Sequence, residues 1–285
     1  FPKGSKLLTK SYHDWLYLQN PFGPAKAVYV CTNGEWAGFM ALVPVQLARK
    51  GETMNAYFAV NVLVDPSYRG RNLFARMITA ASEFAKNENA ALLGHPNAAA
   101  FLFWKRKKMH FQQELRPTLA IPGPSRWSLT SRTAASSETL REGIASFEQI
   151  VGESSRWKIA ATPEYLEWRF IKHPSNSYSV QILEHKGIAV GVQVTKRIKP
   201  GLHMFIDHFV DASFKNAALA KLPVFTVSFV PDDLVTEIGR RLLRLPWKKR
   251  LPIFFTNFEH PVLAISDVEC AKTGCSKFVK NIGRR

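Results

Sequence analysis

Residues 60–85 read VNVLVDPSYRGRNLFARMITAASEFA, and they place a strand, a basic turn and an amphipathic helix in immediate succession. The β-branched residues of 61–64 favour a strand, and Asp65-Pro66 interrupts it. Further along, apolar residues recur at the spacing of one helix face. The pattern predicts a strand over 61–64 and a helix that begins near Asn72.

The basic turn before this helix has the composition of an anion-binding site. Gly70 permits unusual backbone dihedrals, and the first N–H groups of a helix have no partners inside the helix. The positive end of the helix and the side chains of Arg69, Arg71 and Arg76 would attract a phosphate group to the same place. A single glycine in a basic turn also occurs on ordinary protein surfaces, so the residues alone leave both interpretations open.

The segment resembles the acetyl-CoA signature of the GNAT superfamily of N-acetyltransferases, in which Arg or Gln-x-x-Gly-x-Gly or Ala follows a strand and opens a helix. Arg69 matches the leading residue. Asn72 stands where the family usually has its central glycine, and Phe74 stands where it usually has a second small residue. Asparagine also adopts left-handed backbone conformations, whereas the ring of Phe74 is expected to narrow the pyrophosphate channel.

A second part of the chain resembles the same family. Residues 91–94 favour a short buried strand, His95-Pro96-Asn97 a turn, and 98–109 a helix. In the family, the corresponding strand splays away from its neighbour, and an asparagine at the start of the next helix borders the thiol end of CoA. The family helix often carries a tyrosine that protonates the departing thiolate, whereas here the aromatic residues of the helix have no hydroxyl.

The resemblance implies an acyl-CoA-dependent N-acyltransferase that uses acetyl-CoA, needs no metal and transfers the acetyl group directly to an amine. Catalysis would then depend on alignment and electrostatics. His95 is the candidate base, because the family places its bases at strand ends and imidazole titrates near neutral pH. Asn61 occupies a strand position from which some relatives supply a carboxylate, and an amide cannot act as a base. The implied cofactor-binding residues are Val62, Leu63, Val64, Arg69, Gly70, Arg71, Asn72, Leu73, Phe74, Ala75 and Asn97.

The chain also contains an internal repeat. Residues 15–21 (WLYLQNP) recur as 168–174 (WRFIKHP), and two glycines of the segment that follows recur at the same offset of 153. Residues 63–68 (LVDPSY) are echoed by 209–214 (FVDASF) at an offset of 146, which indicates a shorter hairpin in the second copy.

The repeat predicts two domains, at 1–130 and 138–285, joined by a stretch rich in Pro, Ser and Thr over 122–138. Each is expected to be an α/β (α+β) unit with its own core, in which helices flank a mixed, mostly antiparallel twisted sheet. The second copy has KNAA at 215–218 in place of the basic glycine turn. It is therefore expected to be a degenerate GNAT-like domain that binds no CoA and shapes the acceptor pocket, as the resemblance to tandem GNAT proteins implies.

Local signals place the boundaries of several elements. Ser11 followed by Asp14 resembles a capping box, and Thr162-Pro163 combines a cap with a first-turn proline. Hairpins are expected to turn at Asn33-Gly34 and at Lys186-Gly187.

The chain is strongly basic. Its 39 lysine and arginine residues against 22 acidic ones give a formal charge of +17, with clusters at 105–108 and 247–250. The phosphate groups of CoA are one class of anion that such a surface would bind. The alternative is a non-catalytic GNAT-fold protein that binds a polyanion such as nucleic acid, although no helix-turn-helix or RNA-binding signature accompanies the charge.

Composition limits the remaining classes. A hydrophobic fraction of 46% and a charged fraction of 21% are typical of a soluble globular protein, and the apolar segments are too short to cross a bilayer. Cys31, Cys270 and Cys275 lack zinc-site spacing and are expected to be reduced thiols in the cytoplasm. Phe1 indicates that the natural start lies upstream. Tandem GNAT proteins resemble bacterial enzymes that acylate polysaccharides and small molecules, so a small-molecule amine such as an amino sugar is the expected acceptor, and the oligomeric state stays open.

Overall fold

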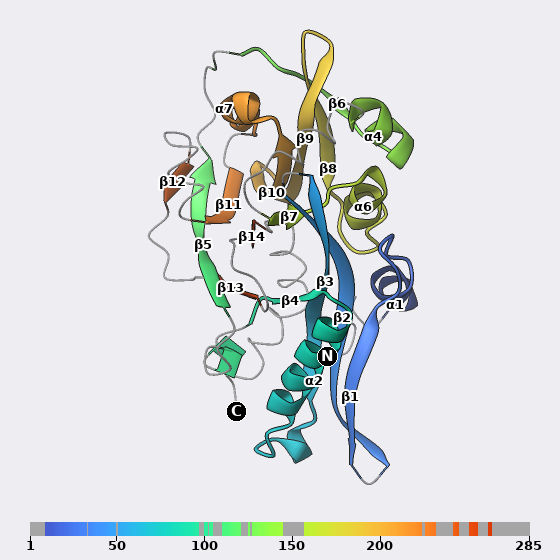
Figure 1. Cartoon of the computed structure of the whole chain (residues 1–285). Coiled ribbons are helices and arrows are strands. Elements are labelled where there is room, and N and C mark those ends of the chain that lie inside the picture. The colour runs from blue at the N-terminus through green and yellow to red at the C-terminus, as the bar shows by residue number, and fades with distance from the viewer. Residues whose placement is uncertain are drawn as a thin grey trace.

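A twisted β-sheet runs through the computed structural model, and helices cover both of its faces (Figure 1). The structure describes residues 9–32, 34–49, 51–96, 100–101, 103–104, 110–120, 125, 127–144, 157–223, 226–231, 242–244, 251–255 and 262–263. Within these residues the sheet contains 14 strands, most of them antiparallel to their neighbours. This is the mixed α+β architecture that the sequence predicts.

The described helices and strands are as follows. The helical elements are α1 (Lys10–Tyr17), η2 (Pro66–Tyr68), α2 (Leu73–Asn87), α4 (Ser137–Ile144), α6 (Pro163–Leu166), η3 (Glu167–Ile171), η4 (Ala212–Phe214) and α7 (Lys215–Ala220). The strands are β1 (Lys26–Thr32), β2 (Glu35–Arg49), β3 (Glu52–Val64), β4 (Ala91–Gly94), β5 (His110–Ala120), β6 (Thr130–Thr133), β7 (Trp157–Ile159), β8 (Ser179–His185), β9 (Ile188–Lys199), β10 (Leu202–Val210), β11 (Thr226–Pro231), β12 (Leu242–Arg244), β13 (Leu251–Phe255) and β14 (Val262–Leu263). The sheet order is β14-β7-β2-β3-β4-β13-β5-β11-β10-β9-β8-β6, with β1 paired to β2 and β12 to β5.

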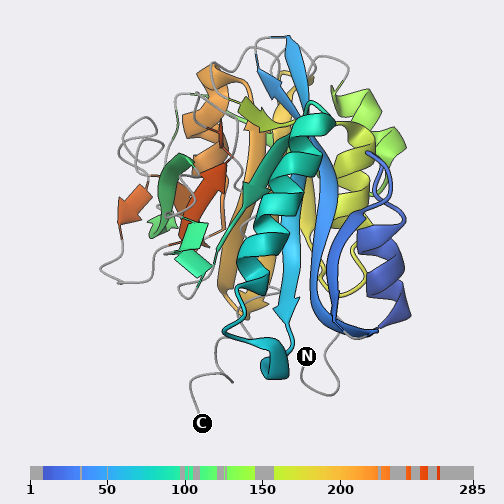
Figure 2. The ribbon, with the colours of Figure 1, turned by 60° about the horizontal axis from the view of Figure 1, so that its bottom comes forward.

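In the first half of the chain, β1, β2 and β3 form an antiparallel meander, and α2 connects β3 to the parallel strand β4. Helix α2 lies against one face of these strands (Figure 2). Its apolar side packs there, and Met77 shares a buried cluster with Met40. Helix α1 covers the opposite face through Trp15 and Leu16. Two predictions are confirmed: α2 begins directly after Asn72, and β4 is buried along its whole length.

The second half repeats this succession of elements. Strands β8, β9 and β10 form an antiparallel meander, and β11 is parallel to β10. The irregular pairing after Val30 in β1–β2 has a counterpart after Leu183 in β8–β9. Asp65 and Asp211, which precede η2 and η4, each accept a hydrogen bond from the backbone N–H two residues later. The repeat in the sequence therefore corresponds to repeated backbone geometry.

The copies differ in length. Strands β2 and β3 contain 15 and 13 residues, whereas β9 and β10 contain 12 and 9. The shorter hairpin explains the change of offset in the repeat, as the sequence predicts. Helix α7 has 6 residues against 15 in α2.

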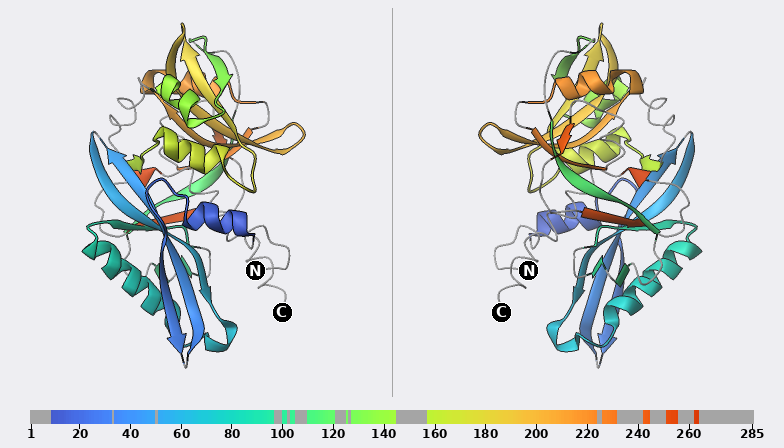
Figure 3. Two further views of the ribbon diagram at one scale, coloured as in Figure 1. Left: turned by 90° about the vertical axis from the view of Figure 1, so that its right-hand side faces the viewer. Right: turned by 90° about the vertical axis from the view of Figure 1, so that its left-hand side faces the viewer.

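Strands from the two halves alternate at the centre of the sheet. Strand β13, from late in the chain, lies between β4 and β5 and pairs with both. Strand β5 pairs with β13 and, through residues 115–120, with β11. Figure 3 shows β5 and β13 at the junction between the blue first half and the yellow second half. Each half thus contributes a strand to the sheet of the other.

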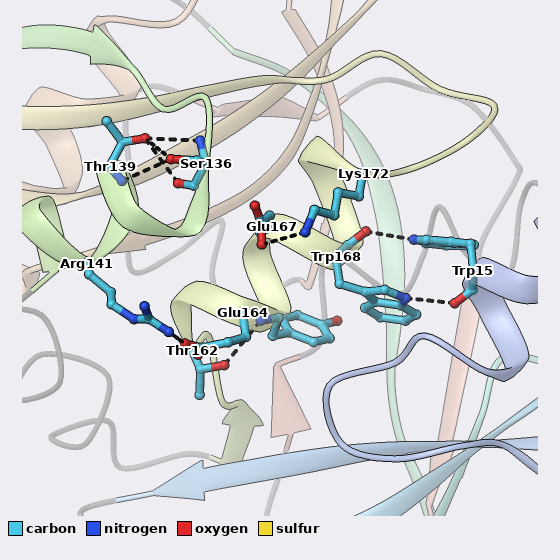
Figure 4. Close-up of polar contacts among 10 residues, drawn as sticks. Trp15, Ser136, Thr139, Arg141, Thr162, Glu164, Glu167, Trp168 and Lys172 are labelled. Carbon is cyan, nitrogen blue, oxygen red and sulfur yellow. Dashed lines mark hydrogen bonds and ion pairs between the residues drawn. The ribbon is translucent and has the colours of Figure 1, made fainter.

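The largest apolar core belongs to both halves. Val43 and Trp15 from the first half share it with Val192 and Trp168 from the second. The two indole rings stack with centroids 4.9 Å apart. Nε1 of Trp15 donates to the carbonyl oxygen of Trp168 at 2.7 Å, and Nε1 of Trp168 donates to that of Trp15 at 2.8 Å (Figure 4). Smaller clusters lie within each half, but the expectation of separate cores is wrong for this cluster, because equivalent faces of the two repeats bury each other.

The start of α1 differs from the prediction. Thr9 is the N-cap, and its Oγ1 accepts a hydrogen bond from a backbone N–H in the first turn at 3.3 Å. Asp14 pairs with Lys10 one turn earlier, so the predicted capping box of Ser11 with Asp14 is wrong. The predicted cap at Thr162 is confirmed, since its Oγ1 accepts from a backbone N–H of α6 at 3.2 Å (Figure 4).

Some predicted features lie outside the described residues. Residues 100–101 and 103–104 are helical, and β5 begins at His110. No helix in the part of the chain that the structure describes is long and apolar enough to cross a membrane. Outside the described residues lie Asn33, Asn97, the rest of the helix predicted over 98–109, residues 121–124, the clusters 105–108 and 247–250, Cys270 and Cys275.

Candidate functional site

The connection from β3 to α2 reverses the chain through two left-handed residues. Gly70 has a φ of +78° and Asn72 a φ of +59°. No atom lies within 4 Å of a Cβ built on Gly70, so the backbone conformation, and not crowding, favours glycine there. Asn72 takes the central position because asparagine tolerates this conformation better than most residues with a side chain.

The N-terminal end of α2, residues 70–75, presents backbone N–H donors and is called the mouth of α2 below. Asn72 is its N-cap, but the asparagine side chain makes no capping hydrogen bond. The N–H groups of Leu73, Phe74 and Ala75 therefore have no partner inside the helix. The side chains of Leu73 and Ala75 are buried in the core, so these residues can serve a ligand only through their backbone.

Positive charge surrounds this mouth. Arg69, Arg71 and Arg76 are all exposed. The Arg71 guanidinium lies over the ring of Tyr68, 5.1 Å from its centroid, and the Tyr68 hydroxyl donates to Glu35 on β2 at 3.1 Å. The hydrogen bond to the Glu35 carboxylate raises the pKa of Tyr68, so the phenol stays neutral. Its ring face attracts the Arg71 guanidinium through a cation–π interaction.

An acidic residue braces the turn from within. Asp65 accepts hydrogen bonds from the backbone N–H of Ser67, at 2.8 Å, and from the Ser67 hydroxyl. These bonds hold the pKa of Asp65 below its usual range. Asp65 therefore stays ionised and holds the turn that carries Arg69.

Strands β3 and β4 part beside the same loop. They pair in parallel from Ala56 with Ala91 to Ala59 with Gly94. Beyond that point β3 continues to Val64, and its pairing with β2 shifts between Phe39 and Ala41. Asn61, with a φ of +50°, lies in this irregularity. The backbone of Val62, Leu63 and Val64 thus runs along the open side of the divergence.

Aromatic packing closes the other side of the divergence. A Cβ on Gly94 would come within 2.2 Å of the Trp104 ring, so glycine allows the indole to lie against the end of β4. The Phe74 ring meets the Phe103 ring edge-on, with centroids 5.0 Å apart. This contact joins the first turn of α2 to the helical residues after β4.

The predicted catalytic residue lies at the end of β4. His95 follows Gly94 directly, and its ring packs 5.5 Å from the Phe58 ring on β3. His95 therefore lies where β4 ends and β3 continues toward Val62, and Asn97 lies outside the described residues. No group of His, Cys, Asp and Glu side chains in the described residues is arranged to hold a metal ion.

One polar contact at the divergence has no counterpart in the sequence predictions. Asn61 Nδ2 donates to the hydroxyl of Tyr17, the last residue of α1, at 2.7 Å. The two residues are 44 positions apart, so no local pattern signals that they meet.

Comparison with known proteins agrees with this geometry. Residues 6–102, which include α2 and β4, match the family model described as "Acetyltransferase (GNAT) domain". Residues 6–102 of this chain are therefore similar to a GNAT acetyltransferase domain. A search of the curated proteins finds no match.

Several solved structures share the fold. A protein of Enterococcus faecalis V583 described as a probable N-acyltransferase has a TM-score of 0.63 at 14% identity; the match covers 90% of this chain and 66% of that one. A tandem GNAT protein from the clavulanic acid biosynthesis pathway has a TM-score of 0.51 at 12% identity, with 83% and 84% covered. Saccharomyces cerevisiae N-myristoyltransferase with bound myristoyl-CoA has a TM-score of 0.54 at 12% identity, with 90% and 72% covered. The chain thus spans just under two thirds of the length of the Enterococcus protein, and identities this low concern the fold alone.

Proposed function

We propose that this protein is an acyl-CoA-dependent N-acyltransferase that transfers an acetyl group from acetyl-CoA to an amine. The observation that carries the proposal is the mouth of α2, where uncapped N–H groups, two left-handed residues and exposed arginines meet beside diverging strands. This is the arrangement that binds phosphate groups at helix N-termini. It lies within the segment that matches the GNAT acetyltransferase domain.

In this proposal the residues divide into three groups. The N–H groups from Gly70 to Ala75, with Arg69 and Arg71, would hold the pyrophosphate of CoA. The backbone of 62–64 would pair with the pantetheine arm, since β3 has left β4 at that point. Asn97 is proposed to border the thiol end.

The chemistry proposed is direct attack of the amine on the thioester. The bound acyl-CoA would supply an activated acyl group, and the protein would align it with the amine and stabilise the developing charge. A backbone N–H of 62–64 would polarise the thioester carbonyl. His95 would take the proton from the attacking nitrogen, directly or through water.

The second half is proposed to be a degenerate GNAT-like domain, with the boundaries 1–130 and 138–285. Its α7 has only 6 residues, and Lys215 and Asn216 replace the basic glycine turn. It would wall off the acceptor pocket, because the shared core and the exchanged strands fix it against the first half. A small-molecule amine such as an amino sugar is the proposed acceptor. The exposed thiol of Cys31 supports a cytoplasmic location.

One observation favours a second candidate function. The formal charge of +17 exceeds what a single CoA requires. If Phe74 blocks the cofactor, the same surface would serve a non-catalytic protein that binds a polyanion such as nucleic acid.

Calorimetry with acetyl-CoA tests the proposal. Arg71→Glu should weaken binding at least about tenfold, because a charge-assisted hydrogen bond contributes roughly 1.5–3 kcal/mol and 1.4 kcal/mol corresponds to tenfold. Gly70→Val should weaken it comparably without a change of charge, since a β-branched residue does not adopt a φ of +78° without strain.

The matched control is Arg197→Glu, which reverses an exposed arginine on β9 in the second half and should leave the affinity unchanged. Absent acetyl-CoA binding in the wild type, alongside salt-sensitive binding of single-stranded DNA, would contradict the transferase and favour the polyanion-binding protein.

A further inference from the structure

Tyr17 reaches the candidate site from the face opposite α2. It is the last residue of α1, which covers the side of the sheet away from the phosphate-binding mouth. Its hydroxyl lies at Asn61, just beyond the last pair of β3 with β4. The phenol therefore stands where the strands part, which is where the proposed function places the reacting thioester.

The direction of the hydrogen bond bears on what the phenol can do. The Asn61 amide donates at 2.7 Å, so the Tyr17 oxygen acts as the acceptor and its own hydrogen takes no part in this contact. An amide donor also stabilises the negative charge that develops on a phenol oxygen when it gives up a proton. The His13 ring packs edge-on against the Tyr17 ring, with centroids 4.9 Å apart, and helps to fix the ring position.

The second half of the chain serves as an internal control for this pair. At the repeat offsets of 153 and 146, the positions of Tyr17 and Asn61 are occupied by Phe170 and Asp207. The second half keeps the strand irregularity, since the pairing of β10 with β9 also shifts next to Asp207. It keeps the stacked tryptophan as well. The strand irregularity thus forms in the second half without a phenol–amide pair, so this backbone geometry does not require the pair.

We propose, on the basis of the transferase function above, that Tyr17 is the acid that protonates the departing thiolate. The amine nitrogen forms a bond to the thioester carbon, the C–S bond breaks and the sulfur keeps its electron pair. The Tyr17 O–H gives its proton to this sulfur, which releases free CoA thiol. His95, which has taken the proton from the attacking nitrogen, then passes a proton through water to the phenolate that Asn61 stabilises, so the products are the amide and CoA. This role accounts for the absence of a hydroxyl among the aromatic residues of the helix that follows β4.

The test is thiol release from acetyl-CoA by the full chain, with the amine that reacts fastest among glucosamine, spermidine, lysine and the dipeptide Gly-Lys. Tyr17→Phe should lower kcat by about 10²-fold or more and leave the Kd of acetyl-CoA within twofold. The loss of rate that a phenol acid produces at high pH should be present in the wild type and absent from the variant. Asn61→Asp, which introduces the residue found in the second half, should also lower kcat, because a carboxylate only accepts hydrogen bonds and draws the phenol proton toward itself.

The matched control is Tyr29→Phe, because Tyr29 is 57% exposed and its ring stacks on Trp36, which is itself exposed. It should leave kcat unchanged. A Tyr17→Phe variant that binds acetyl-CoA normally and keeps its kcat would overturn the assignment, as would one that only raises the KM for the amine. Neither result would affect the transferase proposal. A wild type that neither binds nor turns over acetyl-CoA would instead overturn the proposed function, and this inference with it.

Discussion

At the scale of single residues, His208 is a buried titratable group in the second half of the chain. It lies on β10 opposite Gln193 and is 9% exposed. Burial, together with the nearby charges of Lys158 and Lys215, lowers its pKa from 6.5 to about 3. The unfolded chain protonates this imidazole as the pH falls below about 6.5, whereas in the folded protein the ring stays neutral down to about pH 3. Stability from the neutral ring is complete above about pH 6.5 and is lost as the pH falls toward 3.

We expect His208→Val to remove part of this acid sensitivity. Valine occupies the equivalent position in the first half, as Val62, so the substitution fits the local backbone. In the wild type, His208 contributes a decrease in the free energy of unfolding of up to about 1.4 kcal/mol per pH unit below pH 6.5. Urea denaturation at pH 7 and pH 5 measures this slope, which should be smaller in the variant. Equal slopes in the wild type and in His208→Val would show that this imidazole is not the source of the acid sensitivity. The control is His13→Gln, at a histidine that is 58% exposed, which should leave the slope unchanged.

At the scale of elements, Phe74 connects α2 to the helical residues that follow β4. Its ring contacts Phe103 and packs against the core beneath α2. In the proposed function, the pyrophosphate of CoA binds at the first turn of α2, where the Phe74 ring is expected to narrow its channel. The contact therefore stabilises the fold and opposes entry of the cofactor.

We expect Phe74→Ala to change affinity and stability in opposite directions. Acetyl-CoA should bind several-fold more tightly, because the ring no longer joins the two elements, while the free energy of unfolding should fall by about 2 kcal/mol for a half-buried ring. Calorimetry and urea denaturation measure the two effects. Phe103→Ala removes the same contact from the other side and should have the same signs. Weaker binding in both variants would indicate that the rings support the cofactor site instead of narrowing it.

Local patterns predicted the elements better than their contacts. The strand, turn and helix around Gly70 and Asn72 follow from periodicity and from the two residue types that tolerate left-handed backbone. The cap at Thr9 was missed because Ser11 and Asp14 offer an equally good local signal, and only the pairing of Asp14 with Lys10 distinguishes them. Contacts between elements, such as Tyr17 with Asn61, form only when the sheet brings distant residues together. A short stretch of sequence therefore does not predict them.

At the scale of the whole molecule, the two halves share a core and exchange strands. The repeat in the sequence predicted two copies of one architecture. It could not predict that β13 would lie between β4 and β5, because strands so distant in the chain carry no signal of their pairing. The repeat also could not predict that Trp15 and Trp168 contact each other. Two separate cores would bury both tryptophans equally well.

The reciprocal contact predicts equal effects from equivalent substitutions. Trp15→Phe and Trp168→Phe each keep a ring in the stack but leave one buried carbonyl oxygen without its donor, which costs about 1–3 kcal/mol. Both variants should unfold in one cooperative transition, with similar losses of stability by fluorescence and by circular dichroism. Trp36→Phe, at a tryptophan that is 64% exposed, should have no such effect. Two separate transitions, one of them unaffected, would contradict a shared core.

The most direct test of the central claim is a crystal structure of the protein with CoA bound. The account predicts the pyrophosphate at the mouth of α2, within hydrogen-bonding distance of the N–H groups between Gly70 and Ala75 and beside the Arg71 guanidinium, with the thiol end between β3 and β4. A structure in which that mouth stays empty while CoA binds elsewhere, or does not bind at all, would contradict it.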